Sequence, residues 1–357
     1  MPPLAELRRI LVFRALVLGD WLCATPALRA LRAAAPLAHI VLCGLPWTAA
    51  LARRLPGVEG FLEFPGHPDL PERQPEPGAL ERFLAEARGQ GHDLALQMHG
   101  SGGIVNPLVA SLGARWTAGF AVPGTEEGLD LAVPWPEQGT EIHRCLALTD
   151  ALGAPRAGLG IDFPLTETDR REAAAVREAA GVTRPYALVH PGSQLPSRRW
   201  APERFAQVAD ALAARGLTVA ITGGPEEAPL AAAVRAASTH PPIDLTGRTA
   251  SLWTLGALVE GATVVVANDT GVSHIAAALG TPSAIVASGS DVSRWAPLDA
   301  HRHPVHWHDA PCRPCAHREC PTEHECAAGV HAPDVIETVV KLLEHHHPCH
   351  PTAACAS

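Results

Sequence analysis

A chain of 357 residues with 47% hydrophobic and 18% charged residues is long enough for two domains and has the composition of a soluble folded protein. Its net charge of −9 argues against bulk nucleic-acid binding, which needs a basic surface. No uncharged run approaches the ~20 residues of a membrane span, and Arg14 and Asp20 interrupt the stretch that imitates a signal peptide. We therefore expect a cytoplasmic protein.

The first 55 residues depart from this average, because they carry seven arginines and two acidic residues, a net charge of +5. The arginines are either solvated and scattered, or they form a face that meets an anionic partner or membrane surface. The sequence slightly favours such a face. It would draw on Arg8, Arg9, Arg14, Arg29, Arg32, Arg53 and Arg54.

Short β-branched or leucine-rich runs alternate with helical patterns through the first half, which predicts βαβ units and a parallel sheet. Residues 25–36 predict a helix with Pro26 in its first turn. Residues 65–79 are rich in proline and glycine and predict a surface loop. Strands are expected at residues 9–15, 39–44, 93–100 and 114–122.

The second half restarts the same alternation after a boundary near residues 155–184. Strands are expected at residues 186–192, 217–224, 262–269 and 282–289, and helices at residues 201–216, 226–237 and 272–280. We predict an α/β protein with two Rossmann-like domains whose parallel sheets face a central cleft. The expected parts are residues 1–165, residues 166–332, a C-terminal helix at 333–344 and a disordered tail at 345–357.

Polar loops follow four strands of the second half, at residues 190–193, 222–226, 268–271 and 288–291. Because parallel sheets bind ligands at the carboxyl ends of their strands, these loops predict a ligand site. The pair Arg198 and Arg199, just before a helix, suits a phosphate or diphosphate, although an exposed basic loop is the alternative.

Two acidic residues, Glu226 and Glu227, follow Gly223 and Gly224. They are either ordinary first-turn helix residues, or one of them accepts hydrogen bonds from ribose hydroxyls. No G-x-G-x-x-G follows the first strand and no P-loop motif occurs, which disfavours a dinucleotide oxidoreductase and a P-loop NTPase. Asp20, at a helix start after the first strand, is equally compatible with a general base and a helix cap.

Together these motifs resemble glycosyltransferase family 9, the ADP-heptose:lipopolysaccharide heptosyltransferases and their relatives. The pattern appears in Arg14 with Gly19 and Asp20, in the segments 190–200 and 223–227, in the signature at 268–282, and in Asp291 with Trp295. The resemblance extends to about residue 340.

The resemblance implies the GT-B fold, with acceptor bound by the N-terminal domain and donor by the C-terminal one. It implies inverting, metal-independent transfer, without a cofactor, of heptose or a related sugar from ADP-heptose or a similar nucleotide-diphospho-sugar. The acceptor would be a lipid-linked saccharide of the lipopolysaccharide core or cell envelope. The enzyme would contact the cytosolic face of the inner membrane peripherally.

By position, the resemblance makes Asp20 the base for the acceptor hydroxyl, with Arg14 and Gly19 near the acceptor. Arg198 stands where the family usually has a lysine that contacts the donor diphosphate. The residues implied around the donor are His190, Gly192, Ser193, Arg199, Gly223, Gly224, Glu226 or Glu227, Asn268, Asp269, Thr270, Gly271 and His274.

Four cysteines follow the donor motifs with the spacing C-x2-C-x4-C-x5-C, at Cys312, Cys315, Cys320 and Cys326. Their number suits a structural zinc or iron–sulfur site, and reduced thiols or local disulfides are equally compatible. Two other functions stay open. One is a non-catalytic nucleotide-sugar-binding protein in which Asp20 only caps a helix, and the other is a GT-B-type nucleotide-sugar epimerase.

Overall fold

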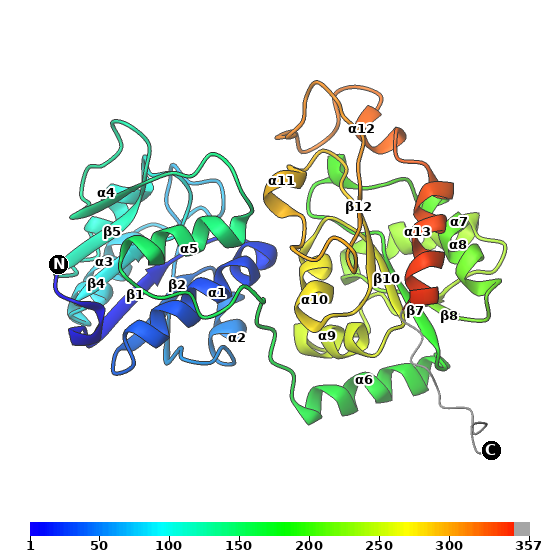
Figure 1. Cartoon of the computed structure of the whole chain (residues 1–357), viewed down its shortest axis with the longest axis horizontal. Helices are drawn as coiled ribbons and strands as arrows, with labels where there is room; N and C mark the ends of the chain where they lie inside the picture. The colour runs from blue at the N-terminus through cyan, green and yellow to red at the C-terminus, as the bar shows by residue number, and fades with distance from the viewer. Residues whose placement is uncertain (346–357) are drawn as a thin grey trace, which may run out of the picture. The chain divides into compact units, whose positions relative to one another are not determined.

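The computed structural model describes residues 1–345, which fall into two compact units. The N-terminal unit ends at Pro164 and the C-terminal unit begins at Leu165. Each unit is built on one six-stranded parallel sheet with helices packed against it (Figure 1). The prediction of an α/β protein with two Rossmann-like parallel sheets is therefore confirmed. Of the tail predicted at residues 345–357, His345 is the last residue of α13, and residues 346–357 lie outside the described residues.

The N-terminal unit alternates strands and helices from its first strand onward. Its strands are β1 (Arg9–Phe13), β2 (His39–Gly44), β3 (Gly60–Glu63), β4 (Leu94–Gln97), β5 (Trp116–Ala121) and β6 (Leu131–Pro134). Its helices are α1 (Leu18–Ala34), α2 (Thr48–Ala52), α3 (Ala79–Gly89), α4 (Val105–Ala110) and α5 (Glu141–Ala151), preceded by the short turn η1 (Leu4–Glu6).

The C-terminal unit opens with a helix and then repeats the alternation. Its strands are β7 (Tyr186–His190), β8 (Thr218–Ile221), β9 (Ile243–Asp244), β10 (Val264–Asn268), β11 (Ser283–Val286) and β12 (Val305–His306). Its helices are α6 (Glu167–Ala180), α7 (Pro202–Ala213), α8 (Ala228–Ala237), α9 (Leu252–Glu260), α10 (Gly271–Leu279), α11 (Val292–Trp295), α12 (Glu325–Ala328) and α13 (Ala332–His345), with the short turns η2 (Pro196–Arg198) and η3 (Pro225–Glu227).

The two sheets have the same strand order, β3-β2-β1-β4-β5-β6 in one and β9-β8-β7-β10-β11-β12 in the other. In each sheet the chain first builds outward from a central strand and then returns to the other side of that strand. The reversal lies between β1 and β4 in the first sheet, and between β7 and β10 in the second. Ligands of open parallel sheets bind outside the carboxyl ends of the strands at this reversal.

Helix α1 is longer than predicted, because it begins at Leu18 and includes Pro26 in its interior. Proline lacks the N–H that would bond to the carbonyl four residues earlier, which is that of Leu22. The hydroxyl of Thr25 donates to this carbonyl at 2.8 Å and replaces the missing bond. The prediction that Pro26 lies in the first turn was therefore wrong, and Asp20 lies in that turn instead.

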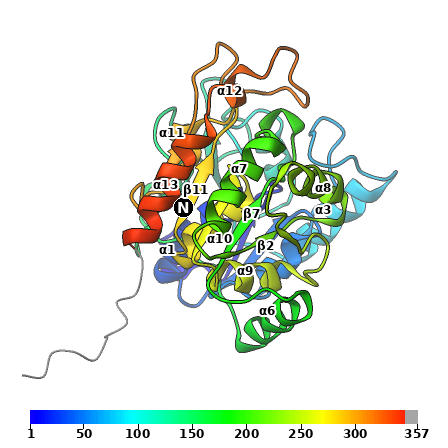
Figure 2. The same cartoon turned by 90° about the vertical axis from the view of Figure 1, so that its right-hand side faces the viewer.

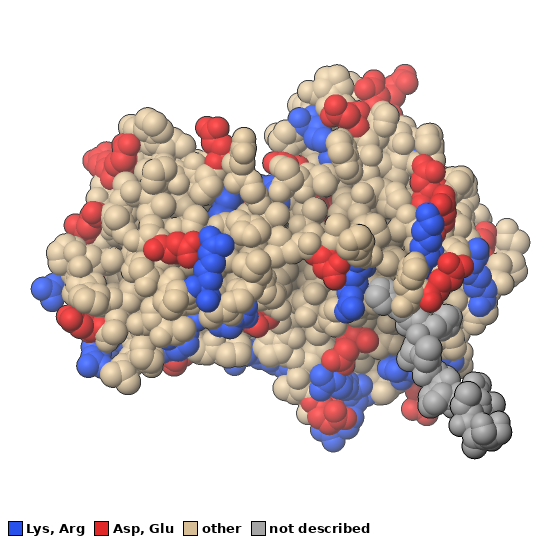
Figure 3. Space-filling view, viewed as in Figure 1, with Lys and Arg blue, Asp and Glu red and all other residues tan. Residues whose placement is uncertain are grey.

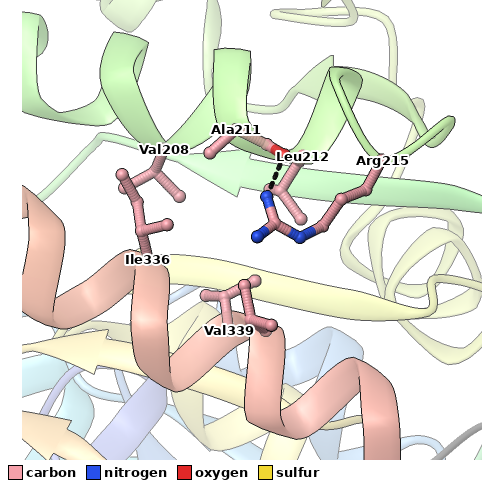
Figure 4. A pocket seen from close by; sticks show the side chains of 7 residues that line it. Val208, Ala211, Leu212, Arg215, Ile336 and Val339 are labelled. Carbon is pink, nitrogen blue, oxygen red and sulfur yellow. Dashed lines mark hydrogen bonds between the residues drawn. The ribbon is translucent and has the colours of Figure 1, made fainter.

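The core of the C-terminal unit is closed by α13, which lies beside α7 in two views (Figures 1 and 2). Trp200 is fully buried, its ring centroid is 5.0 Å from that of Phe205, and its Nε1 donates to the carbonyl of Val330 at 3.0 Å. Figure 4 shows the crevice between the two helices, which has no room for a water molecule. Its lining is Val208, Ala211, Leu212, Arg215, Ile336, Val339 and Val340, and it belongs to the core.

Three of the seven arginines of the N-terminal segment are engaged within the unit. Arg14 is buried, Arg29 pairs with Asp162, and Arg32 pairs with Glu59. On the face seen in Figure 3, basic and acidic side chains are interspersed. Within residues 1–345, no helix is both long and apolar enough to cross a membrane.

We expect Phe205→Ala to destabilise the C-terminal unit by about 3–5 kcal/mol, because it leaves a cavity beside Trp200. Leu298→Ala is the control, since Leu298 is 40% exposed and its truncation should change stability by about 0.5 kcal/mol or less. Urea unfolding followed by tryptophan fluorescence measures both variants. Equal destabilisation by the two substitutions would contradict this description of the core.

Candidate functional site

The loops at the carboxyl ends of β7 and β8 meet around His190. His190 is buried, and its Nδ1 lies 3.1 Å from the hydroxyl of Thr222, which follows β8. Burial lowers the pKa of His190, and the nearby carboxylate of Glu227 only partly opposes this effect. His190 is therefore uncharged at neutral pH and acts as a polar contact between the two loops.

Glu227 folds back over the end of the sheet, whereas Glu226 is exposed. Glu227 Oε2 accepts a hydrogen bond from the N–H of Gly224 at 2.9 Å. A Cβ atom at Gly192 would lie only 1.8 Å from Glu227 Oε1, so position 192 must be glycine for this carboxylate to lie there. Of the two glutamates, Glu227 is the one that lies beside the β7 loop.

Asn268, the last residue of β10, is fully buried and joins two neighbouring loops. Its Oδ1 accepts from the N–H of Trp200 at 3.0 Å, and its Nδ2 donates to the carbonyl of Pro191 at 2.8 Å. The side chain predicted to bind donor is thus engaged with the backbone of the β7 loop. It fixes that loop against the end of β10.

The half-buried residues Asp269 and Thr270 lead from β10 into α10, which starts at Gly271. The N–H of Asp269 donates to the carbonyl of Val286 at 2.9 Å, and Ser273 Oγ accepts from the N–H of Thr270 at 3.3 Å. The start of a helix supplies partial positive charge and N–H donors, which favour an anion. These bonds hold the turn rigidly at the reversal between β7 and β10.

His274 lies buried one turn into α10, and its ring packs nearly perpendicular to that of Trp295, with the centroids 6.2 Å apart.

Arg198 and Arg199 end the β7 loop. The half-buried Arg198 donates from Nη2 to the carbonyl of Cys315 at 3.1 Å, and its buried Nε has no hydrogen-bond partner. Arg199 Nε donates to the carbonyl of the buried Ser193 at 3.0 Å.

Residues 310–326, which we call the thiol loop, connect two loops at the end of the same sheet (Figure 1). On one side, the hydroxyl of Ser197 donates to the carbonyl of His317 at 2.6 Å, and the N–H of Ser197 donates to the carbonyl of Arg318 at 3.1 Å. On the other side, the N–H of Cys315 donates to the carbonyl of Gly289 at 2.7 Å. The thiol loop therefore joins the β7 and β11 loops, whose strands flank β10.

Arg313 is a residue of this edge that the sequence analysis missed. Its guanidinium donates to the carbonyls of Ala287 and Ser290 and lies over the ring of Trp307. The hydroxyls of Ser288 and Ser290 are buried beside it without a hydrogen-bond partner. The only available signal was an arginine between two cysteines, and this spacing does not indicate what the side chain contacts.

The four cysteines of the thiol loop are free thiols in different environments. Cys312 is exposed, whereas Cys315 and Cys326 are buried beside Gly289. Cys320 lies 3.5 Å from the hydroxyl of Thr322. Within residues 1–345, no three His, Cys, Asp or Glu residues are gathered in a way that could hold a metal ion. The predicted structural zinc or iron–sulfur site is therefore not supported.

In the N-terminal unit, Arg14 and Asp20 meet at the reversal between β1 and β4. Arg14 is buried and lies between two carboxylates, with its Nη2 2.7 Å from Glu141 Oε1 and 3.5 Å from Asp20 Oδ1. Its Nε donates to the carbonyl of Asp20 at 3.1 Å, and Nη1 donates to the carbonyl of Met98. The predicted Gly19 is buried next to Asp20 in the first turn of α1.

Burial alone lowers the pKa of the Arg14 guanidinium, but the neighbouring Cys145, Glu141 and Asp20 together raise it above its ordinary value. Arg14 is therefore a permanent cation in this cluster. Asp20 is 9% exposed, so its carboxylate is largely removed from water while a small part stays accessible.

His99, at the carboxyl end of β4, is a second residue that the sequence analysis passed over. Its Nδ1 accepts the N–H of Ala15 at 3.1 Å, and its Nε2 lies 3.3 Å from Glu72 Oε1. Because Nδ1 is an acceptor, Nε2 carries the proton and donates to Glu72. This pair fastens the loop predicted at residues 65–79 to the strand end.

Each unit thus offers its own chemistry at its reversal. The C-terminal unit combines a helix start, two arginines and a carboxylate, which suit an anionic ligand that also carries hydroxyl groups. The N-terminal unit presents a carboxylate at a helix start, paired with a buried arginine, which suits a proton acceptor.

The family model for glycosyltransferase family 9 (heptosyltransferase) matches residues 125–325, more than half of the chain. The chain is also 28% identical over 225 residues to lipopolysaccharide heptosyltransferase 3 of Escherichia coli K12. That match covers 60% of this chain and 62% of the relative, so this chain spans less than two thirds of the relative's length.

Two solved structures show the same fold over nearly the whole chain. A family 9 glycosyl transferase from Veillonella parvula gives a TM-score of 0.78 at 21% identity and covers 95% of this chain and 98% of its own. The ADP-heptose lipopolysaccharide heptosyltransferase II of E. coli gives a TM-score of 0.73 at 20% identity, with 94% and 99% covered. The fold class is therefore GT-B, as predicted.

We expect Gly192→Ala to push the carboxylate of Glu227 away from the N–H of Gly224, because the three atoms nearest to the new Cβ all belong to Glu227. Glu227→Ala removes the same hydrogen bond, so each variant should destabilise the unit by about 1 kcal/mol.

The double variant Gly192→Ala with Glu227→Ala tests whether both substitutions lower stability by breaking the same hydrogen bond. We expect it to be destabilised by much less than the sum of the single variants, since both lose the same bond. Urea unfolding of the three variants and wild type measures this coupling. Additive effects would show that Gly192 and Glu227 act independently.

Proposed function

This chain belongs to glycosyltransferase family 9, and on that premise we propose that it transfers heptose, or a related sugar, from a nucleotide-diphospho-sugar to a saccharide hydroxyl. The favoured donor is ADP-heptose, and the favoured acceptor is a lipid-linked saccharide of the lipopolysaccharide core or cell envelope. The observation that carries the proposal is the strand-end edge of the C-terminal unit, where Arg198 follows β7, Glu227 follows β8 and α10 begins after β10, three neighbouring strands of one sheet.

The donor is proposed to bind with its diphosphate at Arg198 and the start of α10, which supply positive charge and N–H donors. Glu227 is proposed to accept hydrogen bonds from the ribose hydroxyls. Its Oε2 is engaged with Gly224, and its Oε1 faces the β7 loop. Asp269, Thr270 and His274 are proposed to line the sugar end of the donor, and Arg199, Ser193 and Gly223 are proposed to contact the rest of the donor.

In the proposed reaction, Asp20 accepts the proton of the acceptor hydroxyl as that oxygen attacks the anomeric carbon of the donor sugar. The bond from this carbon to the diphosphate oxygen breaks in the same step, so the configuration at the carbon inverts. The diphosphate leaves with increased negative charge, which Arg198 and the helix dipole stabilise without a metal ion. Arg14 and Gly19 are proposed to shape the acceptor side.

The acceptor's lipid anchor would place the enzyme at the cytosolic face of the inner membrane, in peripheral contact with it. Arg8, Arg9 and Arg53 are exposed and are the residues proposed for that contact, whereas Arg14, Arg29 and Arg32 are engaged within the unit. Attraction of this kind is worth about 1 kcal/mol for each basic residue near an anionic surface, so a lasting attachment would rest largely on the acceptor itself.

Asp20→Asn is expected to lower transfer from ADP-heptose by about 10²–10⁴-fold, because the amide cannot accept the proton. Binding of ADP-heptose, measured by calorimetry, should stay within about threefold of wild type. Transfer retained within tenfold would exclude Asp20 as the base. Wild type that binds the donor but transfers nothing to any saccharide would instead indicate a non-catalytic nucleotide-sugar-binding protein.

Glu227→Gln is expected to weaken binding of ADP and ADP-heptose by about 10- to 100-fold, since hydrogen bonds to a charged group are worth about 1.5–3 kcal/mol. Glu226→Gln is the matched control, because Glu226 is the exposed neighbour in the same turn, and its binding should be unchanged. 2′,3′-dideoxy-ADP should bind wild type and Glu227→Gln alike. A larger effect at Glu226 would reverse the assignment.

A further inference from the structure

Glu141 is a buried carboxylate to which neither the family motifs nor the proposed reaction give a role. It is the first residue of α5, 2% exposed, and Thr140 caps the helix by accepting the N–H of His143. Its Oε1 lies 2.7 Å from Arg14 Nη2, and its Oε2 lies 3.9 Å from Arg144 Nη1. A carboxylate buried to this degree is retained in folded proteins when it is paired with a cation, as it is here.

The same nitrogen of Arg14 faces both Glu141 and Asp20, and the distance to Glu141 is shorter by 0.8 Å, 2.7 Å against 3.5 Å. One guanidinium therefore serves two carboxylates, each in the first turn of its helix. Helices α1 and α5 pack side by side (Figure 1). The bond between Arg14 and Glu141 spans 127 residues of sequence, so the fold alone creates this arrangement.

Arg144, Cys23 and Cys145 are titratable groups that also surround the cluster. Arg144 faces Glu141 from the same helix, and its guanidinium is also held by the carbonyl of Glu137 and the ring of Trp135. The thiols of Cys23 on α1 and Cys145 on α5 are buried. Burial raises the pKa of Cys23 well above its ordinary value, so this thiol stays uncharged at neutral pH. Two arginines and two carboxylates thus carry the charge of the cluster.

We propose that Glu141 is a positioning residue that shares the charge of Arg14 and so keeps Asp20 both oriented and basic. This inference rests on the proposed function, in which Asp20 is the general base. An arginine that faced Asp20 alone would stabilise its carboxylate and make it a poorer proton acceptor. Glu141 draws the guanidinium to itself, while Arg14 still holds the Asp20 backbone through Nε.

The charge argument gives Glu141 a signature that a purely structural role lacks. Replacing Glu141 by glutamine leaves the shape of the helix start but removes one negative charge. Arg14 then acts on Asp20 without a competitor, and Asp20 becomes a weaker base. A structural role would lower stability and activity at every pH, but it would not shift the pH at which Asp20 titrates.

The test measures the titration of Asp20 directly, by carbon NMR of the full-length protein labelled at the aspartate carboxyl carbons. The Asp20 signal is identified by its loss in Asp20→Asn. We expect Glu141→Gln to lower the titration midpoint of Asp20 by about one pH unit. Transfer near neutral pH should fall about three- to tenfold, because the base is weaker, and the acidic limb of the rate profile should move to lower pH.

Asp150→Asn is the matched control. Asp150 lies at the other end of α5 and forms an exposed pair with Arg156, with 2.6 Å between Oδ2 and Nη2. This variant also turns a carboxylate of α5 into an amide and breaks an arginine pair, yet it should leave the Asp20 titration unchanged. Glu141→Asp keeps the charge and should restore the wild-type midpoint.

An unchanged or raised Asp20 midpoint in folded Glu141→Gln would overturn the proposal. Should that variant fail to fold, Arg14→Gln with Glu141→Gln removes the cation and its competitor together. Asp20 should then titrate at the same pH as in wild type or at a higher pH, because the cation and the carboxylate that offsets it are removed together, and a lower midpoint would also overturn the proposal. The expected shift in a protein that transfers no sugar would refute the proposed function and leave the charge sharing intact.

Discussion

The side-chain amide of Asn268 is the interaction on which the edge of the C-terminal sheet depends. It is buried at the end of β10 and bonds to the backbone of Trp200 and Pro191, on both sides of the β7 loop. Loss of such an amide leaves a buried N–H and a buried carbonyl unpaired, at about 1–3 kcal/mol for each group. The positions of Gly192 and Arg198 follow from this anchor, because they lie on the loop that it holds, and His190 precedes that loop as the last residue of β7.

In the N-terminal unit, a charged side chain holds the strand ends together. Where the other unit uses a neutral amide, Arg14 bonds to the carbonyls of Asp20 and Met98 and pairs with Glu141. The guanidinium thereby joins the ends of β1 and β4 to the start of α5. A buried ionic link of this kind can be tuned by neighbouring charges, whereas an amide link cannot, so it is suited to a unit that is proposed to supply the base.

Local patterns were sufficient to predict the four central strands of each sheet and most of the polar residues that follow them, whereas the short outer strands β3, β6, β9 and β12 were not predicted. Each strand, each glycine-containing loop and the segment 268–282 is recognisable from neighbouring residues alone. Because ligands of parallel sheets bind at the carboxyl ends of the strands, these separate motifs are expected at one edge without any knowledge of long-range contacts. Glu141, His99 and Arg313 were not predicted, because each is placed by partners far away in sequence, 127 residues in the case of Glu141 and Arg14. Helix α1 was mispredicted for a local reason, since the bond from Thr25 to the carbonyl of Leu22 lets Pro26 lie inside a helix.

The thiol loop accepts hydrogen bonds from Ser197 and Arg198 through the main-chain carbonyls of Cys315, His317 and Arg318. Every residue has a main-chain carbonyl, so substitutions at these positions of the loop leave the hydrogen bonds in place. It cannot change its length there, because one residue more or fewer would move every carbonyl out of register. In a set of related chains, this segment should therefore drift in composition while insertions and deletions between positions 315 and 318 stay rare.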